Sequence, residues 1–339
     1  MKSRAVELFD AAPELAVVAV AVLLIGALLG LVLLARLAVR LVLATRRAGV
    51  IAHVRTMPDV GARIIAADGG VGRRRAVARF LASGAEGHLK DFMFGGPFRI
   101  ATYPGQIRSE QEAAALLERS EADVVLWAEK PRGTSGVARI ASRAPGGGAQ
   151  TLPSAAIAMP RKQSTWTEAV ARALAYAVAK QYRPALGRPQ DFRAERLKPV
   201  VETLLEILAE GPEADPHLIG ELEDDAVSGA LQLAISGDPD WIDRAIDLSR
   251  TLVARANRSV APERWILAKI NLGRSLRVKA ERQFDPVMVR ESISHLQEAL
   301  EALRSEPRFR LAESAAQAIA DGQRLLGARR KFSITGGGI

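Results

Sequence analysis

The chain has 339 residues, contains no cysteine and is poor in aromatic residues, which make up 5% of it. The absence of cysteine excludes disulfide bonds, thiolate zinc sites and cysteine nucleophiles. Its four histidines form no HxxxH pair, and neither GxSxG nor a kinase-type motif occurs. We therefore expect a protein that is not an enzyme and that holds no metal and no cofactor.

Positive charge exceeds negative charge, with 47 Lys and Arg against 38 Asp and Glu, which gives a net charge of +9. Such a balance permits attraction to anionic lipid headgroups or to nucleic acid. The arginines gather next to the one long apolar run, where lipid accounts for them. We therefore expect a membrane partner and no nucleic-acid partner.

The apolar run covers residues 15–34, LAVVAVAVLLIGALLGLVLL, and contains no charged residue. A helix of 20 residues is about long enough to cross the hydrocarbon layer of a bilayer. A cleaved signal peptide is the competing interpretation, but the leader mixes acids with bases and no small-x-small cleavage site follows the run. The pattern predicts a single transmembrane helix.

Arginines follow the run, whereas the leader before it holds two basic and three acidic residues. The arginines after the run are Arg36, Arg40, Arg46, Arg47 and Arg55. The positive-inside bias then predicts that the carboxy-terminal bulk is cytoplasmic, beneath a bacterial inner membrane. Within the run, Gly26 and Gly30 form a GxxxG pair, which predicts a helix dimer contact or arises by chance in an Ala/Gly-rich span.

After the run, segments with strand-like and helix-like patterns alternate. Strands are predicted at residues 62–67, 98–103, 123–129, 137–142 and 151–159, and helices at 72–89, 110–119 and 165–182. Ser109 and Glu112 form a capping box before the second of these helices. The order β-α-β-α-β-β-β-α predicts a mixed sheet covered by helices.

A strand and helix followed by ADVVLWAE, residues 122–129, and a hairpin resemble the small α/β domain at the amino terminus of TolB proteins. The resemblance covers residues 61–182 and implies an interaction or assembly module without catalytic residues. The chain departs from that pattern in its DGGVGRRR segment after the first strand.

That segment, residues 68–75, combines glycines with three consecutive arginines at the start of a helix. Gly70, Gly72, Arg73 and Arg74 could hold an anion against the helix amino terminus. The segment matches neither GxGxxG nor GxxxxGK[ST], and a solvated basic turn is the simpler explanation of it.

From residue 196 onward the pattern is a succession of amphipathic helices separated by Gly- or Pro-containing breaks. Residues 262–302 resemble the tetratricopeptide repeat, with a W-x5-NLG-x2-L first helix that contains Trp265, Leu272 and Gly273 and a second helix that contains Leu296 and Ala299. The resemblance implies two helices that approach closely at Gly273. An acidic stretch between residues 202 and 225 predicts either a solvated face or an acidic docking surface.

The predicted fold class is α+β/α, with one transmembrane helix, a small mixed-sheet α/β domain and a tetratricopeptide-like α-solenoid. Its parts are a leader (1–14), the transmembrane helix with its basic end (15–44), a linker (45–60), the α/β domain (61–182), a connector (183–195), the helical repeats (196–330) and a flexible tail (331–339). We expect a membrane scaffold or adaptor that binds a protein. The alternative is a tethered sensor or enzyme that binds a nucleotide or another phosphate at the Gly/Arg segment.

Overall fold

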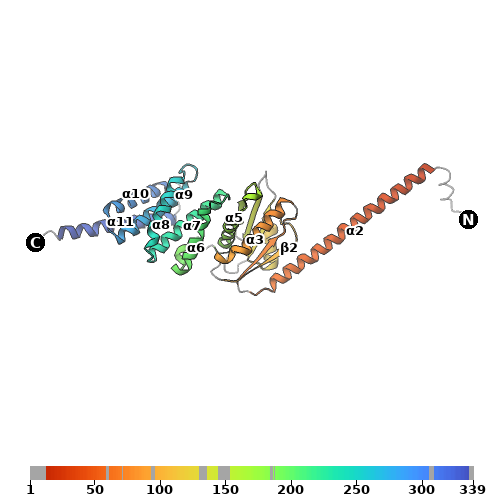
Figure 1. Ribbon diagram of the computed structural model, residues 1–339, viewed down its shortest axis with the longest axis horizontal. Coiled ribbons are helices and arrows are strands. Elements are labelled where there is room, and N and C mark those ends of the chain that lie inside the picture. The colour runs from red at the N-terminus through yellow and green to blue at the C-terminus, as the bar shows by residue number, and fades with distance from the viewer. Residues whose placement is uncertain are drawn as a thin grey trace.

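The computed structural model describes residues 13–58, 61–70, 72–92, 96–129, 136–143, 153–183, 186, 188–304 and 309–335. The molecule is elongated, with a long helix at the amino-terminal end, an α/β unit in the middle and a stack of helices at the carboxy-terminal end (Figure 1). Most of the predicted leader and the loop of the predicted hairpin, residues 144–152, lie outside the described residues.

Helix α2, Pro13–Arg55, contains the predicted apolar run. It is the one helix among the described residues that is long and apolar enough to cross a membrane, and none of its apolar segment is buried. The helix does not stop where the run ends. It continues as one helix through residues 45–55, a segment that we expected to form part of a linker, and its last turns pack against the sheet.

Among the described residues, the sheet has five strands in the order β2-β1-β3-β4-β5. The strands are β1 (Ala62–Ala67), β2 (Phe98–Tyr103), β3 (Val124–Glu129), β4 (Val137–Ser142) and β5 (Ala155–Ala158). Strand β1 is parallel to both β2 and β3, whereas β3, β4 and β5 are joined antiparallel. The prediction of a mixed sheet is confirmed.

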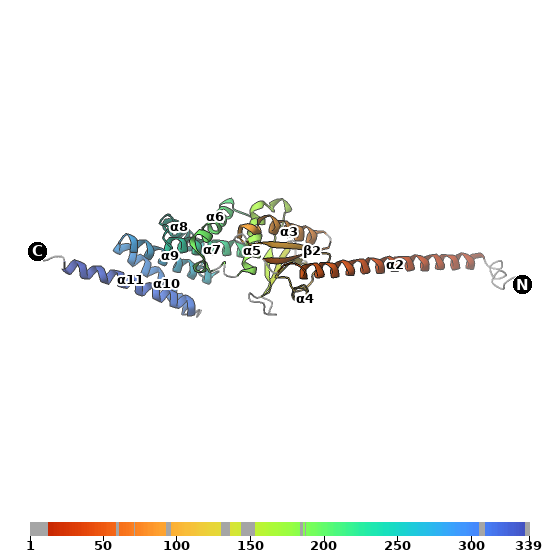
Figure 2. The same cartoon turned by 90° about the horizontal axis from the view of Figure 1, so that it is seen from below.

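Both faces of the sheet are covered by helices. Neighbouring residues of a strand point to opposite faces, so strands β1 to β4 contribute to a buried cluster on each face. Helices α3 (Arg73–Phe92) and α5 (Glu168–Tyr182) cover one face, where Ile64 packs in a buried apolar cluster with residues of both helices. Helix α4 (Glu110–Ser120) and the end of α2 cover the other face (Figure 2). On that face Ile65 packs with Ile51 and Val54. The sheet therefore ties the apolar helix to the domain.

The amino terminus of α4 carries the predicted cap. The Ser109 hydroxyl accepts a hydrogen bond from the Glu112 backbone N–H at 3.2 Å. The Glu112 carboxylate accepts one from the backbone N–H of Arg108 at 2.8 Å, one residue earlier than a standard capping box uses.

In the described part of the chain, six helices follow the α/β unit, arranged as a solenoid-like stack. They are α6 (Ala194–Glu210), α7 (Pro216–Ile235), α8 (Asp240–Arg255), α9 (Pro262–Arg282), α10 (Pro286–Leu303) and α11 (Phe309–Thr335). Helix α9 contacts α7 and α11 as well as α8 and α10, and such contacts between alternate helices are typical of a solenoid-like stack. Helix α11 continues past residue 330, where we expected the repeats to end, and runs into the predicted tail.

The α/β unit and the stack share a core. Val200 and Leu204 of α6 and Leu222 of α7 belong to the same buried cluster as Ile64 of β1. The connecting segment contains a short 3-10 helix, Pro189–Asp191, and the buried Leu186. The first helices of the stack therefore complete the domain core.

Candidate functional site

Two contacts fix the direction of α2 relative to the sheet. Arg47 Nε donates to the Pro104 carbonyl at 2.9 Å, directly after the end of β2. Eight residues later, Arg55 pairs at 3.5 Å with Glu121, which precedes the start of β3. Helix α2 is therefore antiparallel to the parallel strands, and its apolar half projects past their carboxyl ends.

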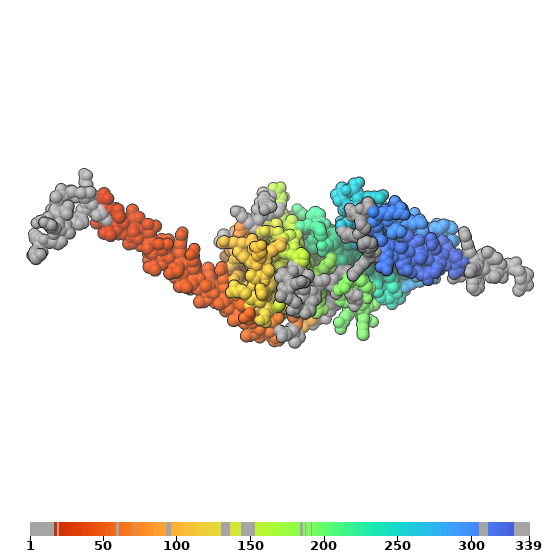
Figure 3. All heavy atoms as spheres, turned by 180° about the vertical axis from the view of Figure 1, so that it is seen from behind, coloured from red at the N-terminus to blue at the C-terminus, as the bar shows by residue number. Residues whose placement is uncertain are grey.

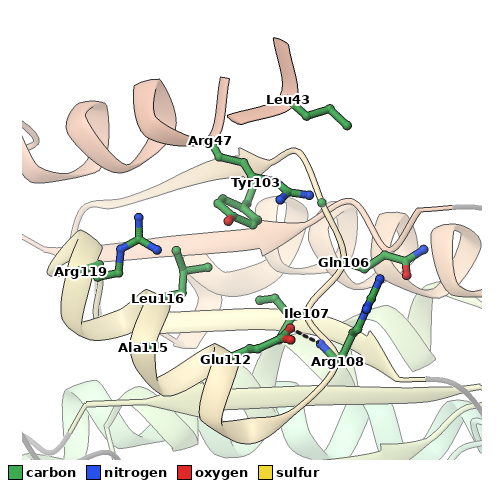
Figure 4. A pocket seen from close by; sticks show the side chains of 11 residues that line it. Leu43, Arg47, Tyr103, Gln106, Ile107, Arg108, Glu112, Ala115, Leu116 and Arg119 are labelled. Carbon is green, nitrogen blue, oxygen red and sulfur yellow. Dashed lines mark hydrogen bonds between the residues drawn. The ribbon is translucent and has the colours of Figure 1, made fainter. Parts of the chain in front are cut away.

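A cavity of about 660 Å³ lies at that edge, between α2, the loop after β2 and α4. Leu43 and Arg47 of α2 form one side, Tyr103 and Arg108 follow from β2 and its loop, and Arg119 comes from α4 (Figure 4). In open α/β sheets, ligands bind at the carboxyl ends of the strands. This cavity is the candidate site of the α/β unit.

The cavity is positively charged. Arg47, Arg108 and Arg119 line it, and Glu112 is its one acidic residue. In the described part of the chain, no carboxylate lies within 4.0 Å of any of the three guanidinium groups. Arg47 is held by the Pro104 carbonyl and lies 5.8 Å from the centroid of the Tyr103 ring. Arg108 and Arg119 are exposed, so their charges are free to meet an anion.

The predicted anion segment has the backbone that its glycines suggest. Gly69, Gly70 and Gly72 have φ values of +70°, +82° and +64°, in the left-handed region that favours glycine. A Cβ on Gly70 would lie 1.9 Å from Gln106 Nε2, so any other residue there would require the Gln106 side chain to move.

The arginines of that segment bind three different partners. Arg73 donates to the Pro160 carbonyl at 2.7 Å, Arg74 to Gln106 Oε1 at 3.1 Å, and Arg75 pairs with Asp68 at 3.4 Å. Arg74 also lines a second cavity of about 380 Å³, together with Arg108 and Glu129. The structure therefore brings Arg74 to the sheet edge, while Arg73 and Arg75 point elsewhere.

The helical stack has a close approach where the sequence predicts one. A Cβ on Gly273 would lie 2.6 Å from Leu296 Cγ and 3.0 Å from the Ser292 carbonyl oxygen. The Ser292 hydroxyl donates to the Gly273 carbonyl at 2.6 Å. Leu296 and Ala299 are fully buried, and Trp265 packs against the same cluster.

Gly229, which comes before Gly273 in the stack, packs against a different neighbour. A Cβ on Gly229 of α7 would lie 2.4 Å from Val201 Cγ2 of α6, the preceding helix. Gly273 instead meets α10, the following helix. The two helix pairs therefore do not repeat the same contact.

Residues of the acidic stretch form ion pairs with basic residues of the α/β unit. Arg172 of α5 binds Glu206 at 2.6 Å and Glu210 at 3.0 Å. Lys180 of α5 binds Asp225 of α7 at 2.6 Å. Several of the acids that could have formed a docking surface are thus neutralised by α5, and they join the stack to the α/β unit.

Burial and neighbouring charges shift the pKa values of Tyr176 and Lys180, where α5 meets α7. The Tyr176 hydroxyl donates to Asp225 at 2.7 Å, and burial raises the pKa of Tyr176 well above its usual value. Burial alone would lower the pKa of Lys180, but Asp225 and Glu221 outweigh it and raise the pKa. Lys180 is therefore charged at neutral pH.

Gly26 and Gly30 lie on the projecting part of α2. A Cβ on either glycine would meet no atom within 4 Å, so the surface around this pair is open. Elsewhere, no group of three His, Asp or Glu side chains within the described ranges could hold a metal ion.

Sequence reasoning missed Arg108 and Arg119 because they lie in separate segments, and only the fold brings them to Arg47. The signal that could have found Arg108 is its position just after a parallel strand. No family model matches the chain, and neither a curated protein nor a solved structure matches it.

Proposed function

We propose that the chain is a membrane-anchored scaffold or adaptor that binds a protein partner. In this proposal α2 crosses a bacterial inner membrane, the α/β unit is a TolB-like interaction module in the cytoplasm, and the tetratricopeptide-like helices carry the binding surface. The apolar, exposed amino-terminal part of α2 supports the anchor. Its continuity with the domain supports a body held close to the bilayer.

The observation that supports partner binding is a group of exposed apolar side chains where α7 ends and α10 begins. Ile235 ends α7, and Phe284 and Val287 flank the start of α10; their exposed fractions are 42%, 37% and 62%. A hydrogen bond from Arg282 to the Ala234 carbonyl holds the ends of α9 and α7 side by side. This bond brings the chain segments of Ile235 and Phe284 together, and apolar side chains that gather on a surface favour protein binding.

A photo-crosslinking residue at position 287 of the full chain, in membranes, tests this surface. We expect a discrete cross-linked protein band there and none from position 260, which is 80% exposed but lies at the other end of α9. Equal cross-linking at both positions, or none at either, would contradict the proposal.

The phosphate-binding alternative has weaker support, because Arg73 and Arg75 already bind groups of the protein. Equilibrium dialysis with nucleotides separates the two functions. Saturable binding that is lost in Arg74→Gln would favour the sensor or enzyme.

A further inference from the structure

The cavity between α2 and α4 meets the end of the apolar surface of α2. Large, largely exposed apolar side chains continue along α2 as far as Val42, and Leu43 is the next residue and lines the cavity. This part of α2 stands clear of the body of the protein (Figure 3). A bilayer around α2 would therefore have its headgroups near the cavity.

Helix geometry gives the depth of the cavity below the uncharged run. At 1.5 Å per residue, Leu43 lies about 14 Å beyond Leu34, the end of the uncharged run. Each headgroup layer is about 5 to 8 Å thick. Arg36 and Arg40 can reach towards water along their aliphatic stems, which lets the apolar surface around them sink further into the membrane. The cavity then lies at or just beneath the headgroups.

Its charge suits a phosphate. Arg47, Arg108 and Arg119 give the lining three positive charges against the one of Glu112, and no carboxylate in the described structure pairs with them. Guanidinium groups bind phosphate oxygens through paired N–H donors. Leu43, Leu116 and Ala115 add apolar lining that an acyl-glycerol group can contact.

We infer that this cavity binds the phosphate-bearing headgroup of an anionic membrane lipid. The inference rests on the proposed insertion of α2. Lipid binding here would hold the sheet edge against the bilayer, because Arg47 and Arg108 come from the two elements that meet there.

Hydrogen exchange of the full chain in lipid nanodiscs tests the inference. We compare discs of phosphatidylcholine alone with discs that also contain phosphatidylglycerol, and follow residues 105–119. Exchange there should be slower with phosphatidylglycerol. Each arginine near an anionic surface changes affinity about fivefold, so Arg108→Gln with Arg119→Gln should weaken binding roughly 25-fold and remove the slowing.

The matched control is Arg99→Gln with Arg290→Gln, which removes the same charge from two exposed arginines that lie outside the cavity. It should keep the slowing. Equal loss in the control would mean a general charge effect and would overturn the site. Slowing by soluble glycerol 3-phosphate in phosphatidylcholine discs would assign the cavity to a free phosphate instead of a lipid.

The same samples separate this inference from the proposed function. If α2 exchanges freely in every disc, the anchor itself fails, and the lipid site fails with it. If α2 is protected but residues 105–119 exchange alike in both kinds of disc, only the lipid site is overturned.

Discussion

Gly273 of α9 lies so close to Leu296 of α10 that a Cβ on the glycine would be 2.6 Å from Leu296 Cγ. The neighbouring Ser292 carbonyl, 3.0 Å from the same position, belongs to the backbone and cannot rotate away. The two helices are therefore held at a distance that only glycine permits.

Gly273→Leu should lower the free energy of unfolding by about 1 to 3 kcal/mol, because the added side chain forces the helices apart. Chemical denaturation of the full chain in detergent, followed by circular dichroism, measures the change. Gly327→Leu is the control, since a Cβ there meets no atom within 4 Å. An unchanged unfolding curve for Gly273→Leu would refute this packing.

Gly26→Leu should weaken self-association in membranes. A bulky side chain prevents close approach of two helix backbones, and the surface around Gly26 and Gly30 is open in the single chain. Energy transfer between labelled chains in vesicles measures the association. Stability of the α/β unit should not change, and equal energy transfer in parent and variant would exclude a dimer through this face.

Lys180→Met should destabilise the junction between α5 and α7 by about 1.5 to 3 kcal/mol, because Asp225 stays buried without its charged hydrogen-bond donor. Adding Asp225→Asn should recover most of that loss. Denaturation midpoints measure both. Lys198→Met is the matched control, since Lys198 pairs with Asp238 at 3.4 Å with 48% of its side chain exposed, and its loss should cost less than about 1 kcal/mol.

Asp224 should make the protein less stable as pH rises. Burial raises the pKa of Asp224 from 3.8 to about 6, against the opposing effect of Arg264. Between those values the folded state holds a proton that the unfolded state releases, so stability falls as pH rises through this window and stays lower above it.

Asp224→Asn cannot ionise and should remove this dependence. We expect the variant to be about 1 to 3 kcal/mol more stable than the parent near pH 8 and little different near pH 4. Denaturation curves across that range measure the difference. A variant less stable than the parent at every pH would mean that the pair with Arg264 outweighs burial.

A reporter fused after Ile339 should be active in the cytoplasm, because arginines follow the apolar run. Activity of a periplasmic reporter at the same point would reverse the proposed orientation. Moving the arginines to the leader should invert the orientation of the parent.

The sequence by itself determined the local elements. The uncharged run predicted α2, alternating and β-branched segments predicted β1 to β4 closely, and Ser109 predicted the start of α4. The breaks at Gly and Pro predicted the helices of the stack, and the resemblance to the tetratricopeptide repeat implied a close approach of two helices at Gly273. These features follow from periodicity, capping and backbone freedom, which act over a few residues.

Only the tertiary structure decided how the parts join. From the sequence, the last turns of α2 were interpreted as a linker, because Ile51 and Val54 have no apolar surface to contact until the sheet forms. The acids of α7 read as a surface because their partner Lys180 lies 45 residues away from Asp225 in the chain. Arg47, Arg108 and Arg119 likewise form one cavity only after the strands have paired. Contacts between distant segments depend on the packing of whole elements, which local patterns do not contain.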